Sequence, residues 1–124
     1  MVIDCLNGEP GIFSARYGGK NLNDDQRVDL VLRNMKGVES IQRGARFISV
    51  ICGIGFYKEP VFSEGIMEGF ISDTKDGING FGYDPIFIPD GYTQTFSQMS
   101  LEQKNKISHR SLAVEKLIQY LEPK

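Results

Sequence analysis

An alternation of apolar and small residues over positions 48–56 constrains the fold of this chain more than any other feature. One set of alternate positions is entirely apolar: Ile48, Val50, Cys52, Ile54 and Phe56. A period of two is typical of a β-strand, because successive side chains of a strand point to opposite faces of its sheet. The other face carries Ser49, Gly53 and Gly55, which are small enough for a helix, more readily than a ligand, to pack close.

A second strand is predicted to follow as a hairpin partner. Lys58-Glu59-Pro60 is typical of a turn, and residues 61–71 can return antiparallel to the first strand. Glu64 and Glu68 fall on one face of this second strand. They are a candidate pair for holding a metal ion, although a solvated strand face is the simpler interpretation.

The remaining elements are predicted from local signals. A strand is expected at 2–6, ended by a turn over 7–11, and another short strand between Pro85 and Pro89. Three helices are expected, with N-caps at Asn23, Ser100 and Ser108, the first two as capping boxes with Gln26 and Gln103. The first helix has the apolar face Val28, Val31, Leu32 and Met35 and ends before Gly37. The last helix has the apolar face Leu112, Ala113, Leu117, Ile118 and Leu121. The sum predicts a mixed α/β (α+β) fold, one domain over residues 1–124, with a largely antiparallel sheet and flanking helices.

Composition narrows the function classes. Fourteen Lys and Arg against sixteen Asp and Glu give a net charge of −2 in 124 residues, which argues against a nucleic-acid-coating protein. No apolar run is long enough to span a bilayer, and the first residues are not those of a signal peptide, so no membrane partner is expected. Cys5 and Cys52 share no metal-ligand spacing, and we expect both as small buried side chains of a cytoplasmic protein.

Two segments carry candidate chemistry. Lys104, Lys106, His109 and Arg110 surround the helix start at Ser108, where free N–H groups favour an anion. A solvated charged face is the alternative. In residues 79–85, Phe81 lies between two glycines, so neighbouring side chains do not cover its ring. An exposed ring of this kind can stack on a nucleobase. The alternative there is a glycine-rich turn whose aromatic side chains cap the core. A third segment, 13–19, offers Ser14 and Arg16 to a phosphate, or uses Arg16 to tie a loop to the sheet.

Three runs of sequence resemble one family. They are Gly80-Phe81-Gly82-Tyr83-Asp84-Pro85-Ile86-Phe87, then Met99-Ser100-Leu101-Glu102-Gln103-Lys104-Asn105-Lys106-Ile107-Ser108-His109-Arg110, and the opening Leu6-Asn7-Gly8-Glu9-Pro10-Gly11-Ile12-Phe13-Ser14-Ala15-Arg16-Tyr17. In order and spacing these runs closely resemble the inosine triphosphate pyrophosphatase family, the Ham1-like dITP/XTP pyrophosphatases.

The resemblance implies a cytoplasmic, usually dimeric, Mg²⁺-dependent hydrolase that converts ITP, dITP or XTP to the monophosphate and pyrophosphate. It implies that Phe81 stacks on the purine, that Gly82, Tyr83 and Asp84 shape the base pocket, and that Lys104, His109 and Arg110 contact the nucleotide. A donor-rich site of this kind accepts a keto group and rejects the amino group of adenine, whose hydrogens leave those donors unpaired.

The N-terminal end of the chain differs from the family's pattern. The resemblance begins after the family's triphosphate-binding loop, its metal-binding Glu and its Asp-Asp-Ser-Gly segment. We therefore expect neither a catalytic residue nor a magnesium ligand here, and Asp4 is no substitute for the missing Asp. The chain is then a truncated family member, and the sequence leaves its own enzymatic activity open. The alternatives are a non-catalytic nucleotide-binding or interaction module and a half-enzyme completed by a separate chain. Strand edges left without neighbours predict a homodimer or higher oligomer.

Overall fold

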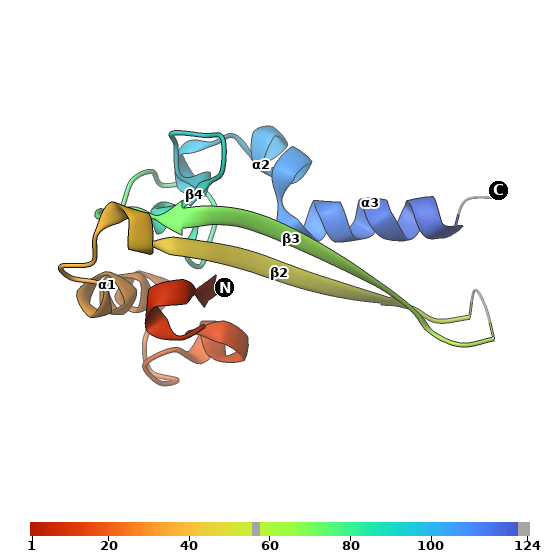
Figure 1. Ribbon diagram of the computed structural model, residues 1–124, viewed down its shortest axis with the longest axis horizontal. Helices are drawn as coiled ribbons and strands as arrows, with labels where there is room; N and C mark the ends of the chain where they lie inside the picture. Colours follow the sequence, from red (N-terminus) through yellow and green to blue (C-terminus); the bar gives the residue numbers. More distant parts are fainter. Residues whose placement is uncertain (56–57, 122–124) are drawn as a thin grey trace.

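A computed structural model describes residues 1–55 and 58–121 (Figure 1). In these residues four strands form one antiparallel sheet in the order β1-β2-β3-β4. The strands are β1 (Val2–Ile3), β2 (Gly44–Gly53), β3 (Val61–Ile71) and β4 (Phe87–Pro89). The predicted α+β class with an antiparallel sheet is confirmed.

The long hairpin of β2 and β3 dominates the sheet. Its pairing runs from Gly44 opposite Phe70 to Gly53 opposite Val61. The outer strands are short: β1 pairs only with Ala45 and Arg46, and β4 pairs only with residues 69–71. The distal half of the hairpin therefore extends beyond both neighbours, as Figure 1 shows. The strand predicted over 48–56 begins earlier and ends earlier than expected, at Gly53 rather than beyond Ile54, and Phe56 lies outside the described residues.

Helix α3 (His109–Leu121) covers one face of this hairpin, as the small residues predicted. A Cβ at Gly65 would collide with the backbone of His109 and Ala113, so the helix can approach only a glycine here. Ser63 donates a hydrogen bond to the Ala113 carbonyl at 2.6 Å. Of the predicted helix face, Ala113 is buried, whereas Ile118 is 53% exposed. The Leu121 side chain lies outside the described side chains.

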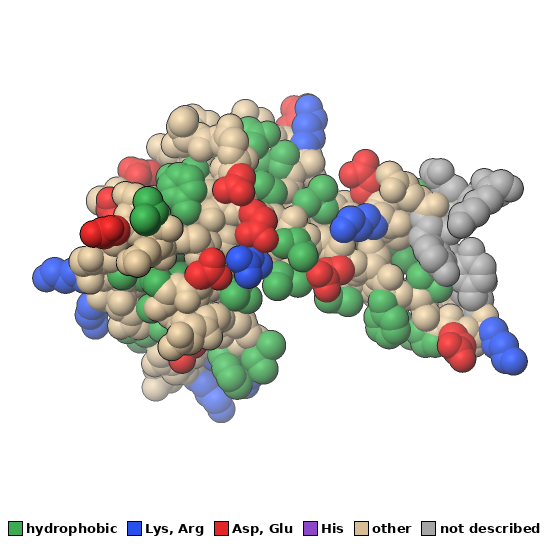
Figure 2. Space-filling model, in the orientation of Figure 1, with side chains coloured by type: hydrophobic (Ala, Val, Ile, Leu, Met, Phe, Trp, Pro, Cys, Tyr) green, Lys and Arg blue, Asp and Glu red, His purple; other side chains and the backbone are tan. Residues whose placement is uncertain are grey.

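The opposite face of the hairpin is the apolar one, and it is uncovered within the described residues. Exposed hydrophobic side chains line the hairpin in Figure 2, and on this face they include Ile48, Val50, Phe62, Ile66 and Phe70. The burial expected for Cys52 is wrong, because Cys52 is exposed on this same face. Cys5 is only partly buried.

The core lies at the other end of the sheet, under helix α1 (Asp24–Asn34). The predicted capping box is confirmed, with Asn23 and Gln26 exchanging two hydrogen bonds of 2.8 Å. The buried apolar side chains of this cluster include Ile3, Val28, Val31, Met35, Ile71, Ile86, Phe87, Phe96 and Met99. The strand predicted at 2–6 is shorter than expected, because residues 4–6 turn as a 3₁₀ helix and Asn7 takes φ 57°.

The last predicted caps are also confirmed. Ser100 and Gln103 form a capping box on helix α2 (Leu101–Ile107). The Ser108 hydroxyl accepts the Ser111 N–H at 3.2 Å at the start of α3. Across the described residues, no helix has the length and apolar character needed to span a bilayer.

Candidate functional site

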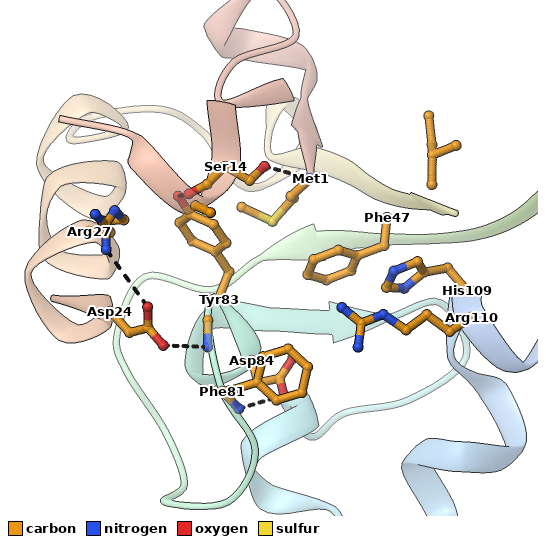
Figure 3. A pocket seen from close by; sticks show the side chains of 13 residues that line it. Met1, Ser14, Asp24, Arg27, Phe47, Phe81, Tyr83, Asp84, His109 and Arg110 are labelled. Carbon is orange, nitrogen blue, oxygen red and sulfur yellow. Dashed lines mark hydrogen bonds and ion pairs between the residues drawn. The ribbon is translucent and has the colours of Figure 1, made fainter. Parts of the chain in front are cut away.

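A cavity of about 290 Å³ lies where five parts of the fold meet (Figure 3). They are the 3₁₀ segment η2 (Gly11–Arg16), the start of α1, strand β2, the loop 80–84 and the start of α3. Six of the seven side chains predicted from the sequence line it: Phe81, Gly82, Tyr83, Asp84, His109 and Arg110. The seventh, Lys104, lines an adjoining cavity of about 160 Å³ that shares Phe81, His109 and Arg110.

The Phe81 loop is built around the Asp84 carboxylate. Gly80 has φ +80°, and a Cβ there would collide with this carboxylate, so the turn requires glycine. The Phe81 N–H donates to Asp84 Oδ2 at 3.1 Å. Asp84 is buried, while the Phe81 ring is 58% exposed. The loop therefore presents the ring to solvent at the cavity, as the sequence predicted.

Two cations approach the Phe81 ring. The Lys104 ammonium lies 4.3 Å and the Arg110 guanidinium 5.3 Å from the ring centroid. Lys104 is also ion-paired with the buried Asp84 carboxylate. Because Asp84 already balances Lys104, the exposed Arg110 supplies the excess positive charge at this ring.

His109 forms part of the cavity wall as a neutral ring. Its imidazole stacks on Phe47, with centroids 5.0 Å apart and planes 13° from parallel. Burial, together with the positive charges of Arg110 and Lys104, lowers the pKa of His109 to about 4. Its Nδ1 is buried and has no hydrogen-bond partner in the described part of the chain, so a second ring proton would go unsatisfied.

Tyr83 is a structural wall rather than a polar contact. Its hydroxyl donates to the Ser14 carbonyl at 2.6 Å and is thereby used within the protein. Burial raises the pKa of Tyr83 to about 12, so the phenol stays protonated. This bond ties the loop 80–84 to η2. Ser14 lines the cavity, whereas Arg16 turns toward Phe13, its guanidinium 5.6 Å from that ring centroid.

The side chains at the cavity that were not predicted as site residues include Asp24, Arg27 and Phe47. Arg27 is buried on α1, where it follows the same helical face as Val28 and Val31. A positively charged residue on an otherwise apolar helix face could have identified Arg27 from the sequence. Asp24 and Phe47 gave no comparable signal, because an acidic residue in a first turn and an aromatic in a strand are both ordinary.

Within the described residues, no group of three or more His, Cys, Asp and Glu side chains could hold a metal ion. The two carboxylates that line the cavity are engaged by the protein's own groups, Asp84 by Lys104 and Asp24 by Gly82 and Arg27. Glu68 is paired with Arg46 at 3.1 Å, which favours the solvated-face interpretation of Glu64 and Glu68.

The fold and cavity define a class: an α+β protein whose aromatic ring, flanked by two cations, lies at the rim of a hollow. Residues 1–120 match the Ham1 family, and the chain belongs to that family. The resemblance found in the sequence is thereby confirmed.

Individual relatives agree with this assignment. The chain is 43% identical over 122 residues to the dITP/XTP pyrophosphatase of Shouchella clausii, covering 98% of this chain and 62% of the relative. It is similar to the Staphylococcus aureus Ham1 protein structure, with TM-score 0.90, 42% identity and coverage of 97% and 62%. It is also similar to the structure of a HAM1 protein from Coxiella burnetii, with TM-score 0.87 and 38% identity, covering 97% of this chain and 62% of that one. The chain thus spans about three fifths of the length of these relatives.

Proposed function

We propose that this chain is the nucleobase-binding part of a pyrophosphatase for deaminated purine nucleotides. The substrates would be ITP, dITP and XTP, and the products the monophosphate and pyrophosphate. The observation that carries the proposal is the exposed Phe81 ring at the cavity rim, with Lys104 and Arg110 close to it. The names of the relatives support the same substrate class.

The base would stack on Phe81. An exposed ring fixed by its own backbone loses little freedom when a purine stacks on it, and such stacking contributes about 1–3 kcal/mol. Gly82 brings no side chain into the cavity, and Tyr83 and Asp84 form the wall behind the ring. Arg110 is positioned from the first turn of α3 to contact a nucleotide that lies against the ring.

Base selection follows from the donors at the site. Arg110 and Lys104 carry only donor groups, and both lie within reach of the Phe81 ring. A 6-keto purine presents an acceptor to such groups, whereas adenine presents an amino donor. Adenine offers these donors no acceptor at that position, so its binding should be weaker.

The hydrolytic step is not assigned to residues of this chain. Phosphoryl chemistry needs neutralised phosphate charge and a group that orients the attacking water. At the cavity, the Asp84 carboxylate is held by Lys104 and Asp24 is held by Gly82 and Arg27. The described residues of this chain thus supply recognition, and we propose that the catalytic groups belong to the part of the longer relatives that this chain does not match.

Calorimetric titration with IMP and AMP tests the proposal. IMP is chosen because it carries the 6-keto base and is the product that remains after pyrophosphate leaves. We expect IMP to bind more tightly than AMP by at least fivefold. Equal affinity for the two nucleotides, or no binding of IMP, contradicts the proposal.

We also propose that the chain associates with a second copy through the uncovered hairpin face. Val50 and Phe62 are 60% and 68% exposed there, and the distal half of each strand lacks an outer neighbour among the described residues. Apolar patches and open strand edges both favour association. A separate chain that completes a half-enzyme is the alternative occupant. Cys5 and Cys52 are both unpaired, which is consistent with the cytoplasmic location that we propose.

A further inference from the structure

We infer that Asp24 is a positioning residue for the nucleobase site, because its carboxylate holds the Phe81–Gly82 loop in the orientation that presents the ring. Asp24 does not contact the Phe81 ring itself. It acts through the backbone of Gly82, which lies 58 residues away in the sequence. This inference rests on the proposed function in that a purine is the expected partner of the ring.

The contact is part of a chain of polar bonds that begins inside the protein. Gly82 N–H donates to Asp24 Oδ2 at 3.1 Å. The other oxygen, Oδ1, lies 3.8 Å from Nη1 of Arg27, one helical turn later on α1. Arg27 is buried and donates through Nη2 to the Gly19 carbonyl at 3.0 Å. Figure 3 shows Asp24 between the Arg27 guanidinium and the backbone beside Tyr83.

Side-chain packing fixes the loop at Tyr83 and Asp84 but not at Phe81 and Gly82, which therefore need such a tether. More than half of the Phe81 surface is exposed. Gly82 has φ +58°, and a Cβ at that position would meet no atom within 4 Å, so no steric wall restrains its backbone. Two consecutive backbone amides hold the loop instead. The Phe81 N–H donates to the Asp84 carboxylate, and the Gly82 N–H donates to the Asp24 carboxylate. Charged acceptors make these hydrogen bonds stronger than neutral ones.

Asp25 provides a matched comparison. It lies beside Asp24 in the first turn of α1, so the helix dipole interacts favourably with both carboxylates. Asp25, however, pairs with Lys75 at 2.9 Å and makes no hydrogen bond to the Phe81 loop. Removing either residue costs the helix one acidic group, but only removal of Asp24 frees the Gly82 amide.

The experiment combines IMP titration with amide hydrogen exchange of Gly82, measured by NMR in the wild type, Asp24→Ala, Asp24→Asn and Asp25→Ala. In Asp24→Ala we expect IMP binding to weaken roughly fivefold to tenfold, because binding must then order a freed loop, and Gly82 exchange to accelerate. Asp24→Asn keeps an acceptor oxygen and should restore most of both properties. Asp25→Ala should keep the wild-type affinity and the wild-type exchange rate at Gly82.

Three results would overturn the inference: equal losses in Asp24→Ala and Asp25→Ala, wild-type affinity in Asp24→Ala, or unchanged Gly82 exchange in that variant. The first assigns the effect to helix charge rather than to the tether. If the wild type does not bind IMP, the proposed function and the positioning role for a purine both fail. Gly82 exchange then still decides whether Asp24 holds the loop.

Discussion

The His109 imidazole lies flat against the Phe47 ring, with centroids 5.0 Å apart and planes 13° from parallel. The stack joins the first residue of α3 to strand β2 at the cavity wall. Burial of the imidazole at this place, together with the nearby positive charges, lowers the pKa of His109 to about 4 and keeps the ring neutral.

The lowered pKa of His109 predicts that the stability of the fold depends on pH. Between pH 6.5 and about 4 the unfolded chain binds a proton at His109 that the folded chain resists, so the free energy of unfolding decreases as pH falls through this window. Above pH 7 the contribution is constant. We expect a loss of about 1–3 kcal/mol, reduced by the partial exposure of the ring.

Urea unfolding of the wild type and His109→Phe at pH 7.5 and 4.5 measures this loss. The variant keeps an aromatic ring against Phe47 and removes the chain's single histidine. The difference in unfolding free energy between the two proteins should shift in favour of the variant at the lower pH. An unchanged difference would contradict the lowered pKa.

Phe81→Ala should weaken IMP binding by about 1–3 kcal/mol, because the base loses its stacking partner. The ring is largely exposed, so the melting temperature should change little. Tyr92→Ala is the matched control, since Tyr92 is also an exposed aromatic but lines no part of the cavity. Equal calorimetric affinities for the Phe81 variant and the wild type would refute the stacking role.

Lys104→Met should destabilise the fold by about 3–5 kcal/mol, because it leaves the buried Asp84 carboxylate without its cation. The double variant Asp84→Asn/Lys104→Met removes both charges and should recover much of this loss. A double-mutant cycle from guanidinium unfolding gives the coupling energy. Strictly additive losses would mean that the two residues do not stabilise each other.

Arg43→Met should destabilise the fold by a similar amount. The buried guanidinium donates to the carbonyls of Ile71, Met35 and Ser72 at 2.8, 3.1 and 2.9 Å, linking the end of α1 to the end of β3. Methionine leaves these carbonyls unsatisfied. Arg33→Met, on the exposed side of the last turn of α1, should change unfolding by less than about 0.5 kcal/mol. Similar losses in the two variants would refute the bridging role.

Phe62→Lys should abolish the self-association proposed for the hairpin face. Phe62 is exposed on that face, so a charge there blocks a partner without disturbing the fold. Light scattering at micromolar concentration should give a dimer or larger species for the wild type and for Tyr92→Lys, but a monomer for Phe62→Lys. A monomeric wild type of 13.9 kDa would rule out this interface.

The sequence by itself determined the local features of this protein. The caps at Asn23, Ser100 and Ser108 depend on neighbours no more than three residues away, so their signals are complete in the sequence. The alternation at 48–56 predicted a strand, and the glycines around Phe81 predicted an exposed ring. The resemblance also named seven residues as substrate-binding; the structure places six of them at one cavity and Lys104 beside it, and their role in binding stays a prediction.

Only the tertiary structure decided that the apolar face of the hairpin stays uncovered within the described residues. The small residues predicted that a helix packs on their own face, because a helix backbone can approach a glycine closely, but a period of two does not say whether the opposite face, with Cys52, is buried. The bonds from Gly82 to Asp24 and from Tyr83 to Ser14 join residues 58 and 69 positions apart. Such contacts depend on how whole elements pack, which no short stretch of sequence encodes.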